Sequence, residues 1–188
     1  MRSPHLDYFQ GQGTEVLLLT EPIDSFMLMG LRKYKDFELE NVAQAKVDLP
    51  EKPREQAAEE KIPEADFSTL VERFKAVLGE RVTGVRASSR LSQSVARLVD
   101  ADDALSPELQ RVYKYLGREY EVPKKILELN PGHSILKNLL ALEAGSDLQN
   151  LIIEQIYDNA LLVEGLHPDP SSIAARVQQI IEAALAKK

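Results

Sequence analysis

Two stretches decide the fold of this chain: SDLQNLIIEQIYDNALLVEG (residues 146–165) and DPSSIAARVQQIIEAALAKK (residues 169–188). In the first, Ser146 is followed three residues later by Gln149, which is the spacing of a helix capping box. In the second, Asp169 can cap a helix, and Pro170 is favoured in the first turn of one. The sequence therefore predicts two consecutive helices at the carboxyl-terminal end.

The apolar residues of these two helices recur at helical spacing and cover more than one side. The first helix has one stripe formed by Leu148, Leu151, Ile152, Ile156 and Val163. Its second stripe is formed by Ile153, Tyr157, Ala160 and Leu161. A helix pair that is apolar on two sides needs two partners, its own domain and a second surface. We expect the second surface to be a copy of the same pair, which forms a four-helix bundle about a two-fold axis. The alternative is that both stripes form core within one chain, folded over a sheet. The residues predicted at the dimer interface are Leu148, Leu151, Ile152, Ile156, Ile173, Val177, Ile180, Ile181, Ala184 and Leu185.

Composition excludes several functional classes. Hydrophobic residues make up 44% and charged residues 28% of the 188, which is typical of a globular protein. The net charge of −7 argues against a nucleic-acid partner, and the lack of cysteine excludes disulfides, zinc–thiolate sites and thiol catalysis. No run approaches the roughly 20 apolar residues that cross a membrane, and the first residues lack the apolar segment of a signal peptide. We therefore expect a soluble, cytoplasmic protein with no membrane partner.

Residues 1–47 are predicted to form a small α/β piece. The apolar run 15–20 is expected to be a strand buried on both faces, Pro22 and Asp24 to open a helix, and residues 37–42 to form a weaker strand. Because a piece with so few elements cannot bury a core of its own, we predict that it is the end of a larger domain. Residues 48–65 are predicted to be a charged, proline-containing linker, with a short helix around residues 54–60 as the alternative.

Residues 66–188 are predicted to form an α+β domain. We expect strands at 82–87, 95–99 and 124–130, which together make a small mixed sheet. The predicted helices run from Asp66 to Gly79, from Ser106 to Gly117 and from Asn130 to Gly145, before the final helix pair.

Motifs for catalysis or metal binding are missing from the sequence. The two glycines Gly11 and Gly13 lack the third glycine of a dinucleotide fingerprint. The cluster of Asp100, Asp102 and Asp103 lacks the glycine and the glutamate of a calcium loop. No histidine belongs to a ligand-spaced pair, and His133 is expected to cap or pack. The sequence therefore predicts a non-catalytic interaction module with no metal site.

Several segments resemble one family of chaperones. They are residues 3–6 (SPHL), 15–19 (EVLLL), 82–91 (VTGVRASSRL), 96–99 (ARLV), 126–133 (ILELNPGH) and 160–162 (ALL). They are similar, in this order, to the end of the middle domain and to the C-terminal domain of the heat-shock protein 90 chaperones of the bacterial type. The resemblance implies a C-terminal fragment of a dimeric, ATP-driven folding chaperone that acts under stress. It also implies that residues 1–47 close the middle domain and that 66–188 form the dimerisation domain.

The same resemblance implies partners and cofactors. ATP and Mg would bind an N-terminal domain that this fragment lacks, so no cofactor and no ATPase activity are expected here. Unfolded or partly folded client proteins would contact an apolar helix of the C-terminal domain and an aromatic residue of the middle domain. The chain ends in Ala186-Lys187-Lys188, without the acidic motif that recruits co-chaperones in eukaryotic members. The alternative function is a purely structural dimerisation module without client affinity. The residues that align with the client site are Phe26, Leu105, Leu109, Val112 and Tyr113.

Overall fold

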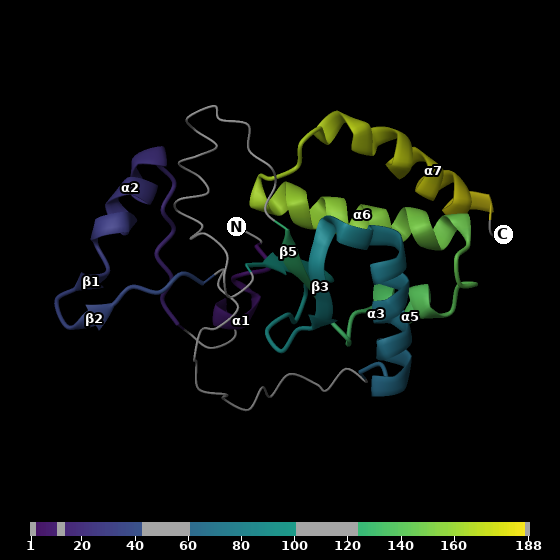
Figure 1. The fold of residues 1–188 in the computed structure, drawn as a ribbon, viewed down its shortest axis with the longest axis horizontal. Coiled ribbons are helices and arrows are strands. Elements are labelled where there is room, and N and C mark those ends of the chain that lie inside the picture. The colour runs from purple at the N-terminus through teal and green to yellow at the C-terminus, as the bar shows by residue number, and fades with distance from the viewer. Residues whose placement is uncertain (1–2, 11–13, 43–60, 101–123, 187–188) are drawn as a thin grey trace.

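A three-stranded mixed sheet lies at the centre of the carboxyl-terminal part (Figure 1). The computed structural model describes residues 3–10, 14–42, 61–100 and 124–186. Strand β5 (Lys125–Leu129) is the middle strand; it pairs in parallel with β3 (Val82–Ala87) and antiparallel with β4 (Ala96–Val99). The prediction of an α+β fold with a mixed three-stranded sheet is confirmed.

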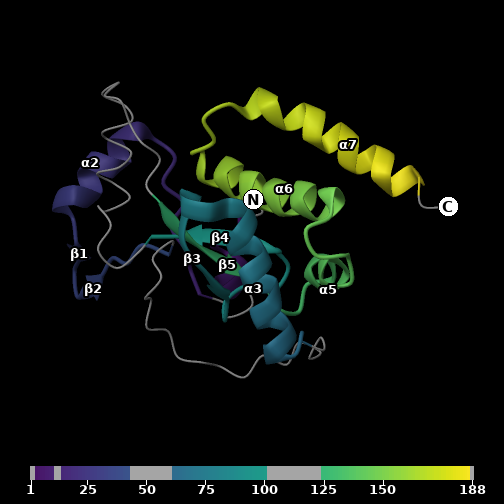
Figure 2. The same ribbon diagram turned by 45° about the vertical axis from the view of Figure 1, so that its right-hand side comes forward.

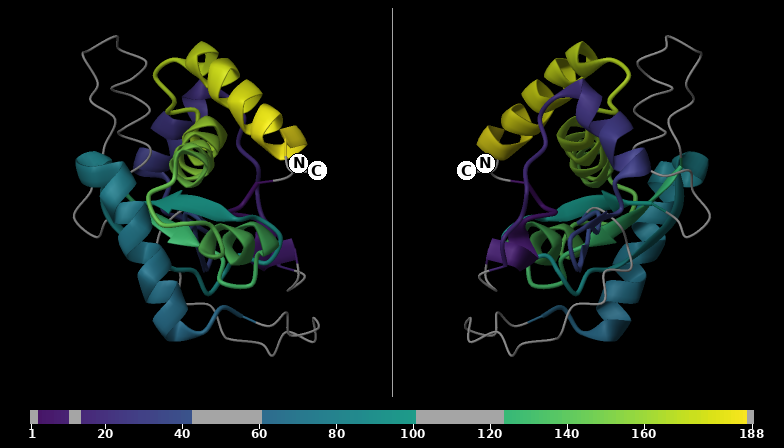
Figure 3. Two further views of the ribbon diagram at one scale, coloured as in Figure 1. Left: turned by 90° about the vertical axis from the view of Figure 1, so that its right-hand side faces the viewer. Right: turned by 90° about the vertical axis from the view of Figure 1, so that its left-hand side faces the viewer.

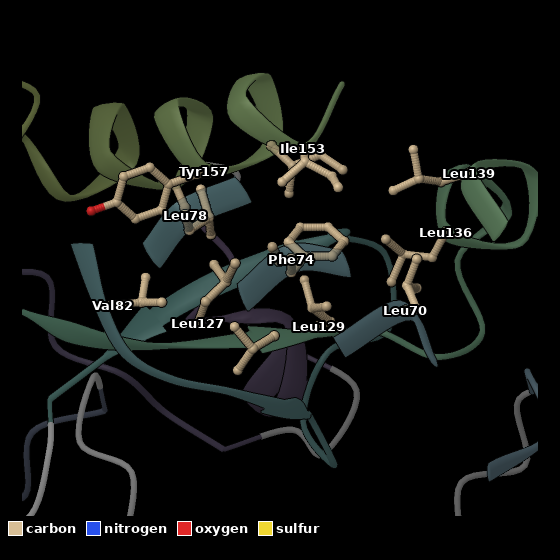
Figure 4. Packing of buried hydrophobic residues seen from close by; sticks show 14 of the residues in the cluster. Leu70, Phe74, Leu78, Val82, Leu127, Leu129, Leu136, Leu139, Ile153 and Tyr157 are labelled. Carbon is tan, nitrogen blue, oxygen red and sulfur yellow. The ribbon is translucent and has the colours of Figure 1, made fainter. Parts of the chain in front are cut away.

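Helices cover one face of this sheet and form the core with it. They are α3 (Glu64–Leu78), which continues into the short 3-10 turn η1 (Gly79–Arg81), α5 (Ser134–Leu140) and α6 (Asp147–Glu164). Leu127 and Leu129 of β5 point to this face because side chains alternate along a strand. Figure 4 shows both leucines in the same hydrophobic cluster as Phe74 of α3 and Ile153 of α6. The core of the domain therefore lies between the sheet and these helices.

The opposite face of the sheet carries charge. Glu128 alternates with the two core leucines of β5, and it pairs in register with Arg97 of β4. The short helix α1 (Asp7–Gln10) lies on this side, away from α6 (Figure 3). Leu6, directly before this helix, and Phe9 within it are buried, so residues 3–10 pack against the carboxyl-terminal part of the chain.

The remaining elements at the amino-terminal end are small. Helix α2 (Pro22–Gly30) begins where the proline predicts it, and the backbone N–H of Glu21 donates to the Asp24 carboxylate at 2.8 Å. Strands β1 (Lys33–Tyr34) and β2 (Phe37–Glu38) form a two-residue hairpin, shorter than the strand predicted at 37–42.

The strand expected at residues 15–20 is a wrong prediction. This segment has no regular secondary structure, and Leu17 is 69% exposed where a strand buried on both faces was expected. An apolar run becomes a buried strand only when other strands pair with both of its edges and layers cover both faces. None of the described residues supplies a pairing strand for it.

The final helices stack on the outside of the core. The 3-10 turn η2 (Pro170–Ser172) leads into α7 (Ile173–Ala186), which lies over α6 on the side away from the sheet (Figure 2). Helix α5 is shorter than the predicted span 130–145 and is capped by His133, whose Nδ1 accepts the N–H of Ile135 at 3.2 Å. Asn130 instead holds the preceding turn, because its side chain accepts the N–H of Gly132.

Some predictions concern residues outside the described part of the chain. They are most of the linker at 48–65 and the helix predicted from Ser106 to Gly117, with Leu105 directly before it and Leu109, Val112 and Tyr113 within it. The domain boundaries at 47/48 and 65/66 remain predictions.

Candidate association surface

Helix α6 has sharply defined ends. At its start the Ser146 hydroxyl accepts the N–H of Gln149 at 3.4 Å, and the Gln149 side chain accepts the N–H of Gly145 at 3.0 Å. At its end Gly165 adopts a left-handed conformation with φ of 66°, which a residue without Cβ adopts at low cost. The capping pattern in the sequence therefore fixes both ends of α6.

One stripe of α6 belongs to the core of the chain. Ile153, Tyr157, Ala160 and Leu161 are buried against α3 and the sheet. The hydroxyl of Tyr157 donates to the backbone oxygen of Arg81 at 3.2 Å, and burial raises the pKa of this phenol. This stripe, the second of the two in the sequence, attaches α6 to its own domain.

The other stripe of α6 is only partly covered. Leu148, Leu151 and Ile152 are half-buried and Val163 is exposed, whereas Ile156 is buried within the chain. Helix α7 packs on α6, while Ile152 packs against the core cluster.

Helix α7 presents apolar side chains to solvent. Of its residues, Ile173 is buried, while Ile180 is half-buried toward α6. Val177, Ile181 and Leu185 are 38%, 52% and 70% exposed, and their spacing of four residues places them along one side. Helix α7 therefore carries more apolar surface than its contact with α6 covers. Of the ten residues predicted at the dimer interface, Ile156 and Ile173 are buried in the chain itself, and the other eight are half-buried or exposed.

A polar cluster joins α7 to α6. The Asp158 carboxylate of α6 is paired with Arg176 of α7, and its other oxygen lies 3.4 Å from Nε2 of His167 in the connection. The carboxylate is nearly inaccessible to solvent. This cluster was not predicted from the sequence, because a charged residue beside an apolar stripe usually lies at the solvated edge of a helix. The available signal was the position of Asp158 directly after the core residue Tyr157.

A second set of polar contacts joins the amino-terminal segment to the carboxyl-terminal part. The Asp7 carboxylate accepts the N–H groups of Gln93 and Ser94 at 3.1 and 2.9 Å, and His5 is paired with Glu164 near the end of α6. No local pattern could have revealed these contacts, because their partners are more than 80 residues apart.

A buried charge network occupies the far face of the sheet. Oε2 of Glu128 accepts from Nε of Arg97 at 2.8 Å and from the Ser88 hydroxyl at 3.0 Å, while Oε1 accepts from Nε of Arg86 at 3.0 Å. Burial alone would raise the pKa of Glu128, but the charge of Arg97 and the hydrogen bonds from Arg97, Arg86 and Ser88 outweigh it and lower the pKa. The network therefore links all three strands of the sheet, through Arg86 of β3, Glu128 of β5 and Arg97 of β4.

The candidate client residue Phe26 lies on α2 and is 48% exposed. Its neighbour Met27 is also exposed, as are Leu18 and Leu19 in the preceding segment. The structure therefore leaves apolar side chains accessible around Phe26. Leu105, Leu109, Val112 and Tyr113, the other residues of this predicted site, lie outside the described part of the chain.

Among the described residues there is neither a metal-binding cluster nor a membrane-spanning helix. Within residues 3–10, 14–42, 61–100 and 124–186, no three or more histidine and acidic side chains gather in a way that could hold a metal ion. Among the helices of the same residues, none combines the length and apolar character that a membrane span requires.

Comparison with known proteins identifies the family. A family model described as Hsp90 protein matches residues 1–188, the whole chain. The chain belongs to the Hsp90 family. It is 34% identical over 187 residues to the chaperone protein HtpG of Chlorobium phaeovibrioides, covering 98% of this chain and 30% of that relative.

Further relatives agree with this assignment to Hsp90. The chaperone protein HtpG of Cupriavidus taiwanensis is 38% identical over 181 residues, and that of Paramagnetospirillum magneticum is 36% identical over 192 residues. The matches cover 95% and 98% of this chain, and 28% and 31% of the relatives. The chain spans about 30% of the length of the curated relatives it matches, and the family resemblance deduced from its motifs is confirmed.

Proposed function

We propose that this Hsp90-family chain is a homodimerisation module that also forms part of a client-binding surface, within an ATP-dependent chaperone that assists protein folding under stress. The observation that carries the proposal is the uncovered apolar row Val177, Ile181 and Leu185 on α7. Exposing several branched side chains along one helix is unfavourable in water, because each contributes about 1.5–3 kcal/mol when it is fully buried. A second protein surface that covers the row removes this cost.

A second copy of the same helix pair suits this row. Two α6–α7 pairs about a two-fold axis give four helices, in which the row of each protomer meets the same surface of its partner. Charge does not oppose this arrangement, because Arg176 and Glu182 are the charged residues of α7 and Arg176 is already paired with Asp158. The partly covered residues Leu151 and Ile152 of α6 would complete the contact.

Dimerisation is tested by measuring molar mass across a dilution series with light scattering. We expect a mass near twice the 21.1 kDa of the chain at high concentration and a fall toward the single-chain mass on dilution. The reason is that burial of the two apolar rows has to exceed an association cost on the order of 4–15 kcal/mol. A chain that stays at the single-chain mass at every concentration would refute the dimer.

Client contact is proposed at the exposed surface around Phe26, together with Leu105, Leu109, Val112 and Tyr113. Exposed aromatic and methionine side chains suit weak contact with many sequences, since partly folded proteins expose apolar surface. Phe26 and Met27 are both accessible on α2, which supports their part in the proposal.

The substitution pair Phe26→Asp and Met27→Asp tests this surface in an aggregation assay with an unfolded substrate. We expect half-suppression to need about tenfold more chaperone than in the wild type, because an aromatic anchor typically carries over 1 kcal/mol of a contact. Ile135→Asp is the matched control, since Ile135 is equally exposed on α5, away from α2. The pair Leu109→Asp and Tyr113→Asp tests the other half of the site.

The alternative is a purely structural dimerisation module. It predicts that the wild-type chain fails to suppress aggregation while the dimer forms normally. Under either function we propose that ATP and Mg act at a separate N-terminal domain of the whole chaperone and that the chain needs no cofactor of its own. We also propose a cytoplasmic location, as the family resemblance implies.

A further inference from the structure

The cluster around Asp158 uses both oxygens of one buried carboxylate. One oxygen is paired with Nη1 of Arg176 on α7, and the other lies 3.4 Å from Nε2 of His167. The side chains of Asp158 and His167 are 9% and 5% exposed. Breaking the pair with the cationic Arg176 would leave this buried carboxylate without its counter-charge, which is strongly destabilising.

A hydrogen bond at one ring nitrogen of His167 shows which ring nitrogen carries the proton that faces Asp158. Nδ1 of His167 accepts the backbone N–H of Asp169 at 3.2 Å. A neutral imidazole that accepts at Nδ1 carries its proton on Nε2, which is the atom that faces Asp158. His167 lies in the connection between α6 and α7, two residues before the Asp169 cap of η2. From there its Nε2–H is directed at the Asp158 carboxylate.

In its first turn α7 is held by this cluster and by one buried apolar residue. Ile173 is the buried residue of the helix, and it lies in the same first turn as Arg176. Since neighbouring residues on an α-helix are separated by about 100° around its axis, the contact of Arg176 with α6 turns Val177 away from α6. Ile181 and Leu185 follow Val177 on the exposed side. Ile173 and Arg176 thus orient α7, and with it the apolar row, at the start of the helix, and the half-buried Ile180 and Ala183 continue the same side further along.

We infer that Asp158 is a positioning residue for self-association: it fixes the placement of α7 on α6 through Arg176 and His167, and so presents the row Val177, Ile181 and Leu185 to a second copy. This inference rests on the dimer proposed above. Asp158 itself is buried within the chain and lies outside the row, so its effect on association is indirect.

The test is the isosteric substitution Asp158→Asn in the full 188-residue chain. We expect the dimer dissociation constant, measured by sedimentation across a dilution series, to rise on the order of tenfold or more. The matched control is Glu72→Gln, because Glu72 makes an exposed pair with Lys75 on α3, away from α7. Asp158→Glu, which keeps the charge, is expected to restore association to within a few-fold of the wild type.

A second measurement reports the position of α7 directly. The chain has no cysteine, so Ala76→Cys on α3 and Gln179→Cys on α7 allow spin labels to be placed at two exposed sites. Labelled chains diluted with unlabelled ones give the distance between α7 and the core within one protomer. We expect a single narrow distribution in the wild type and a broader one with Asp158→Asn, while the thermal unfolding transition of the core stays in place.

The outcomes separate the two proposals. An unchanged dissociation constant and an unchanged distance distribution with Asp158→Asn would overturn the positioning role, although the dimer stands. A wild-type chain that is monomeric at all concentrations would refute the dimer. The role of Asp158 in positioning α7 for self-association would then be refuted as well. If Asp158→Asn lowers the unfolding temperature of the core, Arg176→Gln replaces it, because Arg176 is more accessible on α7. An unchanged dissociation constant with that variant also overturns the inference.

Discussion

The double substitution Ile181→Glu and Leu185→Glu is expected to leave the chain monomeric at concentrations at which the wild type is a dimer. Both residues are exposed in the single chain, so glutamate there can be hydrated without disturbing the fold of the protomer. In a two-fold bundle, by contrast, the four new carboxylates would have to lose water and would face one another. Together with the lost apolar burial, we expect the dissociation constant to rise on the order of 1,000-fold.

Molar mass by light scattering, compared with circular dichroism of the same samples, measures this effect. The matched control is Ile135→Glu, because Ile135 is also an exposed isoleucine but belongs to α5. Leu151→Glu with Ile180→Glu is a weaker test, since both residues are half-buried in the single chain and their replacement also disturbs the protomer. If the Ile181→Glu, Leu185→Glu chain still dimerises with native affinity, the association surface does not include this side of α7.

The substitution Glu128→Gln is expected to lower the free energy of unfolding at neutral pH by about 3–5 kcal/mol, because it leaves a buried arginine without its counter-charge. Arg97 is 2% exposed, and Glu128 is its carboxylate partner at 2.8 Å. Glutamine keeps the shape of glutamate but removes the charge. Denaturant unfolding followed by circular dichroism measures the difference.

The difference in stability between the wild type and Glu128→Gln is expected to depend on pH. The pKa of Glu128 is lowered in the folded chain from its ordinary value of 4.5, so the stability that its charge contributes is present above about pH 4.5. That contribution is lost as the pH falls through the folded pKa. The difference in stability between wild type and Glu128→Gln should therefore shrink on acidification below pH 4.5. Equal stability of the two proteins at pH 7 would contradict the role of the network.

Glu154→Gln is the control for this experiment. Glu154 also pairs with an arginine, Arg81, at 2.8 Å, but the Arg81 side chain is 43% exposed. Exposed pairs of this kind contribute about 0–1 kcal/mol. We therefore expect Glu154→Gln to change stability much less than Glu128→Gln does.

The sequence predicted those elements whose signals are local. The strands at 82–87, 95–99 and 124–130 match β3, β4 and β5 to within one residue at each end, because each is a short segment containing valine, isoleucine or leucine and bounded by turn-forming residues. The Ser146 cap predicted the start of α6, since capping depends on backbone groups only a few residues away. The same logic failed at 15–20, where the fate of an apolar run depends on strands elsewhere in space.

By itself, the sequence determined the helices and strands in the described parts of residues 61–186, the two apolar stripes of α6 and the family to which the chain belongs. The tertiary structure decided which stripe forms the core, because the choice depends on where α3 and the sheet lie. It also decided how far α7 is covered, through the pairing of Asp158 with Arg176 and His167. The physical reason is that periodicity records which residues avoid water, whereas packing between distant segments determines which surface removes them from it.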